Sequence, residues 1–239
     1  MSNIAIIPAR GGSKRIPKKN IKLFCGEPII RYSIENTLES DIFDDVIVST
    51  DDDEIADLAI SYGARVPFLR NKCLADDYTT TGQVILDVIQ RLKRLGKDYK
   101  FCACVYPTAP FMSARKIKEA MEKLILSDAN EIITVVKYSS PPQRAFFYDS
   151  KNIIRKWPQF VNSRSQDLEF LYYDAGQFYG YRTNAYVKNE GNIQDKIIPY
   201  ILLPTEVQDI DNIEDWELAE MKYKMMCGKE KNEKYSNIC

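Results

Sequence analysis

Short apolar runs that alternate with amphipathic segments constrain the fold more than any other feature of this sequence. Apolar runs that predict buried strands lie at residues 4–7, 45–50, 101–105, 131–136 and 197–203. Amphipathic segments that predict helices lie at residues 28–40, 55–62, 82–95 and 113–126, and a last helix ends near residue 226. Strands joined through helices pair in parallel by right-handed crossovers. The order therefore predicts an α/β fold with a mostly parallel sheet.

The loop after the first strand combines glycines with a dense group of cations. Gly11 and Gly12 let the chain turn without steric cost, and Ser13 and Asn20 add neutral hydrogen-bond donors. The cations are Arg10, Lys14, Arg15, Lys18 and Lys19. Ligands bind at the carboxyl edge of a parallel sheet, so the loop is predicted to hold a polyphosphate. The alternative is an ordinary solvated basic loop.

Two common phosphate motifs are absent. The sequence contains no Gly-x-x-x-x-Gly-Lys-Ser/Thr, which excludes a P-loop of the kinase or ATPase kind. It also contains no Gly-x-Gly-x-x-Gly after a strand, which argues against a Rossmann dinucleotide site.

Composition excludes several classes of function. The 239 residues include no histidine, so Ser-His-Asp and Cys-His catalysis and His-bound zinc are ruled out. The net charge is −1, so the basic loop is local and no nucleic-acid-binding surface is expected. No apolar run approaches the roughly 20 residues of a membrane span. Six scattered cysteines without metal-site spacing, and no signal-peptide pattern, predict reduced thiols and a cytoplasmic location.

Asp209 and Asp211 form a candidate metal site. On an extended segment, residues two apart point to the same face, and Mg²⁺ takes one or two carboxylates together with substrate phosphates. The alternative is structural, because Asp211-x-x-Glu214 also fits a helix capping box. The acids at residues 51–53 are interpreted as charges at the start of a helix.

The pattern changes at residues 138–173. Adjacent prolines and clustered aromatic residues interrupt the strand–helix alternation and predict a flap inserted in a single domain of residues 1–226. The flap is expected either to cover the pocket or to form a dimer interface. Arg144 and Arg164 are candidate carboxylate clamps, the alternative being ordinary surface arginines. Residues 227–239 are predicted to be a flexible tail.

A family resemblance rests first on the cation loop, which reads Arg-Gly-Gly-Ser-Lys-Arg-Ile-Pro-Lys-Lys-Asn over residues 10–20. The loop resembles the signature of the cytidylyltransferases that activate nonulosonic (sialic-type) acids, and the resemblance extends from residue 4 to about residue 226. It implies a three-layer, Rossmann-like nucleotide-diphosphosugar transferase fold, with CTP as substrate and Mg²⁺ on Asp209 and Asp211. The residues that it implies for CTP are Arg10, Gly11, Gly12, Ser13, Lys14, Lys19, Asn20, Arg70, Thr79, Thr81, Pro107 and Thr108. Among these, Arg10 and Lys19 would act in catalysis with Asp209 and Asp211.

The resemblance also concerns the sugar acid. The pair of segments at residues 164–168 and 174–179 is similar to the branch that activates pseudaminic acid, for surface glycans or flagellin. Tyr106 stands where members acting on sialic acid carry Gln, which argues against N-acetylneuraminate as the substrate. The residues implied for the sugar acid are Tyr106, Arg144, Arg164, Tyr173, Asp174 and Gln177. Family members are commonly homodimers, so a homodimer is expected here.

Three alternatives stay open. One is the same reaction on legionaminic, N-acetylneuraminic or 3-deoxy-manno-octulosonic acid. Another is a sugar-1-phosphate nucleotidyltransferase, which would be expected to have a Gly-x-Gly-Thr-Arg type of loop. The last is a non-catalytic nucleotide-binding sensor on the same fold. Retention of both the cation loop and the Asp209-x-Asp211 pair argues against a sensor, which has no leaving pyrophosphate to stabilise.

Overall fold

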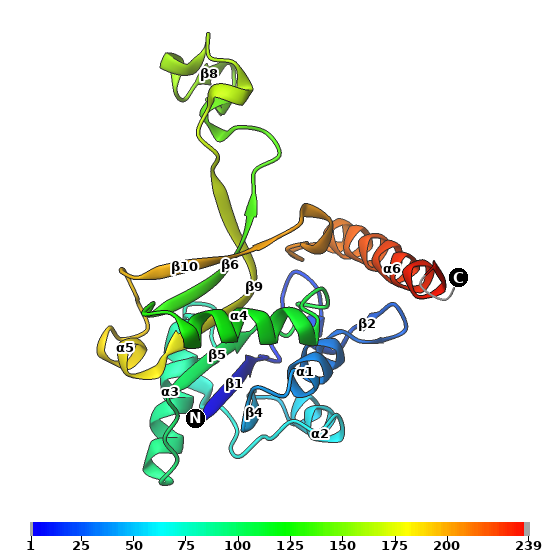
Figure 1. Ribbon diagram of the computed structural model, residues 1–239. Helices are drawn as coiled ribbons and strands as arrows, with labels where there is room; N and C mark the ends of the chain where they lie inside the picture. Colours follow the sequence, from blue (N-terminus) through cyan, green and yellow to red (C-terminus); the bar gives the residue numbers. More distant parts are fainter. Residues whose placement is uncertain (1, 237–239) are drawn as a thin grey trace.

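A six-stranded sheet forms the centre of the protein (Figure 1). The computed structural model describes residues 2–236, with side chains as far as residue 228. The strand order is β10-β6-β9-β5-β1-β4, and only β9 is antiparallel to its neighbours in this sheet. The prediction of a mostly parallel sheet is confirmed. The strands are β1 (Asn3–Pro8), β4 (Asp45–Ser49), β5 (Phe101–Val105), β6 (Glu131–Lys137), β9 (Tyr172–Arg182) and β10 (Ile197–Leu202).

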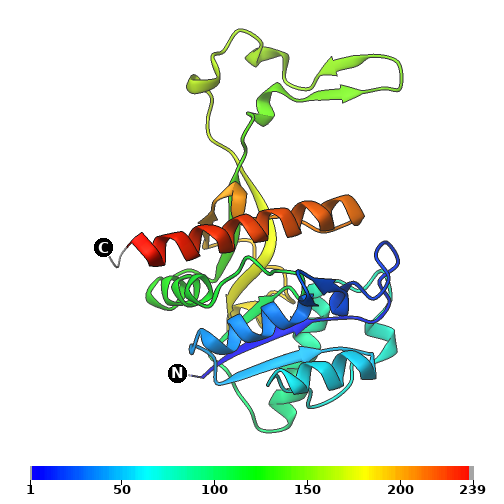
Figure 2. The same cartoon turned by 90° about the vertical axis from the view of Figure 1, so that its right-hand side faces the viewer.

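Helices cover both faces of the sheet and make three layers (Figures 1 and 2). Side chains of β1 alternate between the faces, which is why its whole run is apolar. Ala5 and Ile7 pack in the cluster with α1, α2 and α4, whereas Ile4 and Ile6 pack in the cluster with α3 and α5. The helices are α1 (Ile29–Glu39), α2 (Asp53–Ser61), α3 (Thr81–Arg94), α4 (Ala114–Leu126), α5 (Thr183–Lys188) and α6 (Ile213–Ser236).

The last helix lies beside the cation loop and away from the sheet. Trp216 of α6 packs with Phe24 and Ile16 in a separate apolar cluster, next to the small hairpin of β2 (Leu23–Phe24) and β3 (Glu27–Pro28). α6 continues to Ser236, beyond the predicted end near residue 226. Most of the segment predicted to be a flexible tail is therefore helical, and its residues 237–239 lie outside the described residues.

The flap at residues 138–173 projects from the body between β6 and β9 (Figures 1 and 2). Its far end carries an antiparallel hairpin of β7 (Phe146–Tyr148) and β8 (Ile153–Arg155). Several large apolar side chains of this hairpin are exposed, among them Phe147 at 61% and Ile153 at 66%. The flap therefore leaves an apolar surface open to solvent in the single chain.

Two further findings concern the length of the helices and the state of the cysteines. Within the described part of the chain, no helix combines the length and apolar character needed to cross a membrane. The cysteines described there, Cys25, Cys73, Cys102, Cys104 and Cys227, are free. Burial raises the pKa of the Cys102 thiol to about 12, so this thiol is inert core packing.

A buried carboxylate ties β4 to the far end of α3. Asp45 pairs with Arg65, accepts a hydrogen bond from Lys97 Nζ at 2.7 Å and accepts another from the Tyr99 hydroxyl. Burial alone would raise the pKa of Asp45, but the hydrogen bonds from Lys97, Tyr99 and Arg65 hold it below its ordinary value. The ionised carboxylate thus stabilises the folded state.

We expect Asp45→Asn to lower the free energy of unfolding by about 2 kcal/mol at pH 7, because the amide keeps the shape but loses the charge. Since the folded-state pKa is depressed, this stabilisation exists above the unfolded pKa of about 3.9 and disappears as pH falls through the folded pKa. Urea denaturation at pH 7 and at about pH 3 checks both statements. Asp128→Asn, at an exposed carboxylate, is the control. An equal cost at both pH values would contradict the electrostatic account.

Candidate active site

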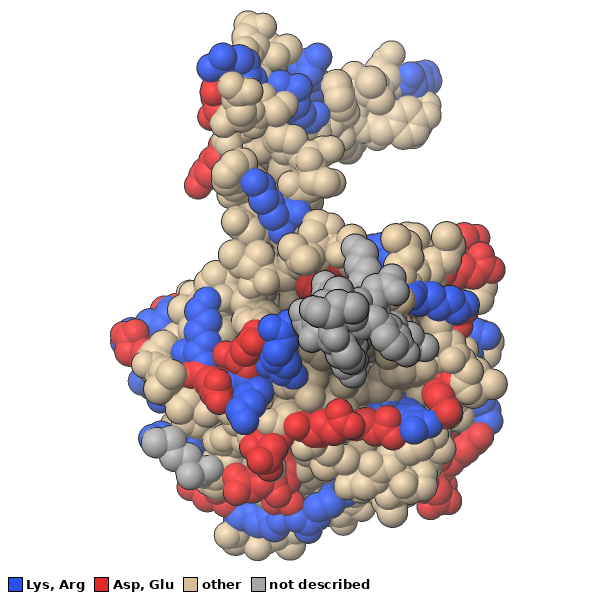
Figure 3. All heavy atoms as spheres, turned by 45° about the vertical axis from the view of Figure 1, so that its right-hand side comes forward, with Lys and Arg blue, Asp and Glu red and all other residues tan. Residues whose placement is uncertain are grey.

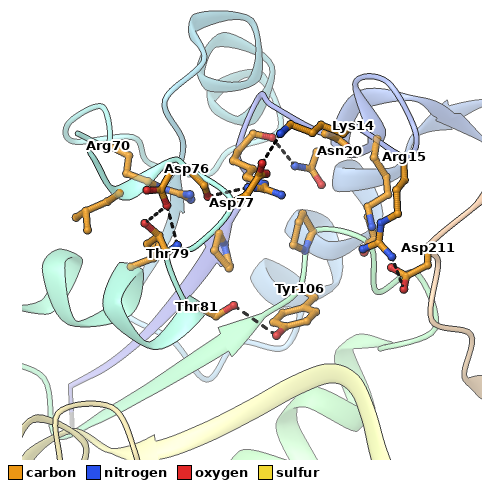
Figure 4. A pocket seen from close by; sticks show the side chains of 18 residues that line it. Lys14, Arg15, Asn20, Arg70, Asp76, Asp77, Thr79, Thr81, Tyr106 and Asp211 are labelled. Carbon is orange, nitrogen blue, oxygen red and sulfur yellow. Dashed lines mark hydrogen bonds and ion pairs between the residues drawn. The ribbon is translucent and has the colours of Figure 1, made fainter. Parts of the chain in front are cut away.

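A cavity of about 580 Å³ opens at the carboxyl ends of β1 and β5 (Figure 4). Three segments and one carboxylate surround it: the cation loop, the stretch leading into α3, the turn after β5, and Asp211. The lining residues are Pro8, Arg10, Ser13, Lys14, Arg15, Lys19, Asn20, Arg70, Leu74, Asp76, Asp77, Thr79, Thr81, Val84, Tyr106, Pro107, Thr108 and Asp211. Segments that are distant in sequence therefore meet where the parallel sheet places a ligand.

Most residues predicted to bind CTP line this one cavity. They are Arg10, Ser13, Lys14, Lys19, Asn20, Arg70, Thr79, Thr81, Pro107 and Thr108. Gly11 and Gly12, also predicted, belong to the loop but are not among the lining residues.

Gly11 anchors the cation loop to the start of α2. Its N–H donates to Asp51 Oδ1 at 3.0 Å, and a Cβ at this position would lie 2.6 Å from Asp52 Oδ2. Asp52 in turn caps α2 by accepting from the Ile55 N–H. A larger residue at this position would therefore force the Asp52 side chain to move, and the Gly11 N–H is committed to Asp51. Asp51 thus holds the cation loop in place through this hydrogen bond. The interpretation of Asp51 as a charge at the start of a helix did not include this role.

Asn20 and Lys19 hold the other end of the loop. Asn20 is buried and its Nδ2 donates to the Arg10 carbonyl at 2.9 Å, which closes the loop on itself. Lys19 Nζ donates to the Ile210 carbonyl at 2.7 Å. Burial lowers the pKa of Lys19, whereas the nearby Asp211 and Asp209 raise it and offset part of that effect. The ammonium therefore lies between the rest of the cation loop and the two acids.

Asp211 is free of the helix-capping duty that was its structural alternative. The box at the start of α6 is made by Asn212 and Asp215: the Asp215 N–H donates to Asn212 Oδ1 at 2.9 Å, and the Asn212 N–H donates to Asp215 Oδ2 at 3.1 Å. A box between Asp211 and Glu214 is therefore wrong by one residue. The Asp211 carboxylate instead lines the cavity, where it pairs with Arg15 at 2.7 Å.

Asp209, two residues before Asp211, does not line the main cavity in the described part of the chain. It lines a neighbouring hollow of about 280 Å³ with Tyr173, Asp174 and Lys222. Burial and the charge of Asp211 raise the pKa of Asp209, while Lys19 lowers it. The charge of Asp211 thus opposes ionisation of Asp209, and a cation beside the pair would favour both carboxylates.

Arg70 and the threonines form the wall opposite Asp211. Arg70 is buried, and its Nε donates to Ser49 Oγ at 3.2 Å while Nη2 donates to the Ser49 carbonyl. Thr80, between the two threonines predicted to bind CTP, caps α3 in a capping box with Gln83. Thr79 and Thr81 line the cavity, and the Thr81 hydroxyl lies 3.5 Å from the Tyr106 hydroxyl.

The residues predicted for the sugar acid fall into three places. Tyr106 lines the main cavity, whereas Tyr173 and Asp174 line the hollow beside Asp209. Gln177 is buried beneath that region, and its Oε1 has no hydrogen-bond partner among the described residues. Arg144 and Arg164 lie in the flap, where Arg144 donates to the Ser163 carbonyl at 2.6 Å and Arg164 pairs with Asp167. Both arginines are thus outside the cavity of their own chain.

Sequence reasoning missed some of the lining. Arg15 was seen only as one of several loop cations, and Asp76 and Asp77 were not predicted to be site residues. Asp77 pairs with Arg10 and Lys14 across more than sixty positions of sequence. The sequence carried a weak signal, since two adjacent acids precede the threonines that open α3. Pairing over such a separation depends on the fold.

Comparison with solved structures defines the fold. The structure of CMP:2-keto-3-deoxy-manno-octonic acid synthetase complexed with CTP superposes with a TM-score of 0.71 at 14% identity, covering 95% of this chain and all of the other. A 4-diphosphocytidyl-2C-methyl-D-erythritol synthase from Anaerococcus prevotii gives a TM-score of 0.60, also at 14% identity, over 93% of this chain and 98% of the other. The fold is that of Rossmann-like nucleotidyltransferases.

Comparison of sequences defines the family. The cytidylyltransferase family model matches residues 4–217. The chain is similar to a pseudaminic acid cytidylyltransferase of Campylobacter jejuni, with 41% identity over 94% of this chain and 97% of the other. It is also similar to the CMP-N,N'-diacetyllegionaminic acid synthase of Legionella pneumophila, with 31% identity over 92% and 95%. The chain belongs to the cytidylyltransferase family and is an enzyme of that kind.

Proposed function

We propose that the chain transfers CMP from CTP to the anomeric hydroxyl of a nonulosonic acid, with pseudaminic acid preferred, and releases pyrophosphate in the cytoplasm. One observation carries the proposal: the cation loop, Arg70, the threonine turn and Asp211 line a single cavity at the carboxyl edge of the sheet. The pseudaminic acid enzyme of C. jejuni is more similar in sequence to this chain than the legionaminic acid enzyme of L. pneumophila. Free thiols support a reducing compartment.

The charges explain the chemistry. The anomeric oxygen attacks the α-phosphorus of CTP, the new O–P bond forms, the bond to the bridging oxygen of the β-phosphate breaks, and the hydroxyl proton leaves to solvent. Negative charge grows on the departing pyrophosphate. Arg10, Lys14 and Lys19 stabilise this charge, and the Ser13 hydroxyl adds a donor. Positioning and electrostatics carry most of the acceleration in such transfers, so no histidine is required.

Arg70, Thr79 and Thr81 are placed to hold the nucleoside. They lie across the cavity from Asp211, so phosphates on the cation loop put the cytosine and ribose toward α3. Pro107 and Thr108 close this side with a rigid turn.

Magnesium is part of this proposal. The described residues contain no group of three or more His, Cys, Asp or Glu that could hold a metal ion. Asp209 and Asp211 nevertheless fit Mg²⁺, which needs only one or two carboxylates when substrate phosphates supply the other oxygens. The ion, when bound there, would neutralise charge on those phosphates. Binding of the ion would require Arg15 to release the Asp211 carboxylate. Because this ion pair is exposed, breaking it would cost little free energy.

The hollow beside Asp209 is the proposed place of the sugar acid. Tyr173 and Asp174 line it, and Asp174 accepts a hydrogen bond from the Tyr179 hydroxyl at 2.7 Å. Asp209 and Asp211 stand two residues apart, one lining each space. A sugar in the hollow would thus approach the nucleotide from the side of Asp209.

The flap is proposed to form a homodimer interface. Its exposed aromatic surface needs a partner, and Lys and Arg side chains gather on the same projection (Figure 3). In the described part of the chain, Arg144 and Arg164 line neither the nucleotide cavity nor the hollow beside Asp209. Arg144 and Arg164 can therefore clamp a sugar carboxylate only in the site of a second copy. The proposed carboxylate clamp therefore requires the dimer.

The substrate is tested by comparing kcat/KM for pseudaminic, legionaminic and N-acetylneuraminic acids, with the CMP-sugar identified by mass spectrometry. We expect pseudaminic acid to be preferred by at least about tenfold, because a misplaced polar group in a sugar pocket costs roughly 1–3 kcal/mol. Preference for another acid would move the specificity and keep the reaction. Binding of CTP with no product from any acid would support the sensor.

A further inference from the structure

Arg10 and Lys14, two of the loop cations proposed to bind phosphate, are already paired with an acid of the same cavity. Arg10 Nη1 lies 3.0 Å from Asp77 Oδ1, and Lys14 Nζ pairs with Asp77 Oδ2 (Figure 4). Arg10 Nη1 also donates to the Asp76 carbonyl at 2.7 Å. The stretch before α3 thus lays a carboxylate where a phosphate group of the nucleotide is proposed to lie.

Asp77 has no structural duty in its own turn. That turn is made by Asp76, whose Oδ1 accepts from the N–H groups of Tyr78 and Thr79 and from the Thr79 hydroxyl. The side chains of Asp77, Arg10 and Lys14 are 40%, 37% and 79% exposed, so their ion pairs add little stability. Weak pairs of this kind exchange readily for a stronger ligand.

We propose that Asp77 is an internal counter-anion that competes with the phosphates of CTP and pyrophosphate for Arg10 and Lys14. This inference rests on the proposed function, which assigns these cations to the leaving pyrophosphate. The Lys14 hydrogen bond and the nearby Arg10 lower the pKa of Asp77 despite slight desolvation, so its carboxylate is charged at neutral pH.

The consequence concerns product release. A polyphosphate bound to Arg10 and Lys14 displaces Asp77, whose carboxylate then stays beside it as a like charge. When the bond to the α-phosphate breaks, Asp77 can take the cations back as pyrophosphate departs. The enzyme thereby keeps a strong clamp during transfer without holding the product tightly afterwards.

Asp77→Asn tests this role, because the amide keeps the size and loses the charge. We expect the Kd for inorganic pyrophosphate, measured by calorimetry with and without Mg²⁺, to fall about three- to tenfold, as two weak ion pairs are removed from the competition. The KM for CTP should fall in the same direction, and product inhibition by pyrophosphate should strengthen. Asp77→Ala should shift the Kd in the same direction.

Two controls separate this effect from general charge. Asp128→Asn makes the same change of net charge at an exposed carboxylate that pairs with Lys196, and it should leave the pyrophosphate Kd unchanged. In a Lys14→Ala background, Asp77→Asn should have a smaller effect because one of the contested cations is gone.

An unchanged or higher Kd in Asp77→Asn would overturn the inference, since it would show that Asp77 does not compete or that it helps to bind the ligand. A wild-type protein that binds neither pyrophosphate nor CTP would overturn the proposed function together with it. Binding by the wild type without any change in the variants would reject Asp77 alone.

Discussion

Asp211→Ala is expected to remove nearly all turnover, with kcat for pyrophosphate release falling at least about a hundredfold. Of the two proposed metal ligands, Asp211 lines the nucleotide cavity, and its carboxylate does not cap α6. Its loss would remove a proposed metal ligand and leave Arg15 without its partner. Pyrophosphate release from CTP, Mg²⁺ and the preferred acid measures the effect.

Asp53→Ala is the matched control, because Asp53 is an exposed acid in the first turn of α2. It should keep its activity and lose at most a few tenths of a kcal/mol of stability. Full activity in Asp211→Ala would reject the metal assignment. A collapse of activity in both variants would mean that general charge, and not the site, is being measured.

Lys19→Ala should be the second most damaging change. Lys19 is a partly buried cation of the loop, fixed to the Ile210 carbonyl and close to both acids. Removing a preorganised donor to developing charge costs about 10²–10³ in kcat. Steady-state kinetics with thermal unfolding as a check on folding would establish this.

Lys18→Ala provides the comparison from the adjacent position. Lys18 has a φ of 51°, and its side chain pairs with Glu54 of α2. It is not among the residues that line the cavity. Its KM and kcat should stay within about twofold, since exposed pairs contribute little. Equal losses at residues 18 and 19 would show that only the net charge of the loop matters.

The fold followed from sequence because its signals are local. Apolar runs such as residues 4–7 predict buried strands, and the side chains of β1 are buried on both faces as expected. The position of the cation loop at the carboxyl edge followed from the parallel order of the strands. These parts needed no knowledge of contacts distant in sequence.

Other features depended on the fold itself. No local signal in the sequence gives the antiparallel direction of β9 or its position between β5 and β6. The pairing of Asp77 with Arg10, and the support of Gly11 by Asp51, join segments that only the sheet brings together. The cap at α6 was misplaced by one residue because Asp211 and Asn212 are both good capping residues.

The most direct test of the central claim is a crystal structure with CTP and Mn²⁺ in place of Mg²⁺. The proposed function predicts the triphosphate on Arg10, Lys14 and Lys19, with an anomalous peak from the metal at Asp209 and Asp211. In that structure, Asp77 should no longer pair with Arg10 or Lys14. A triphosphate bound away from the cation loop, or a metal held at Asp76 and Asp77 instead, would contradict it.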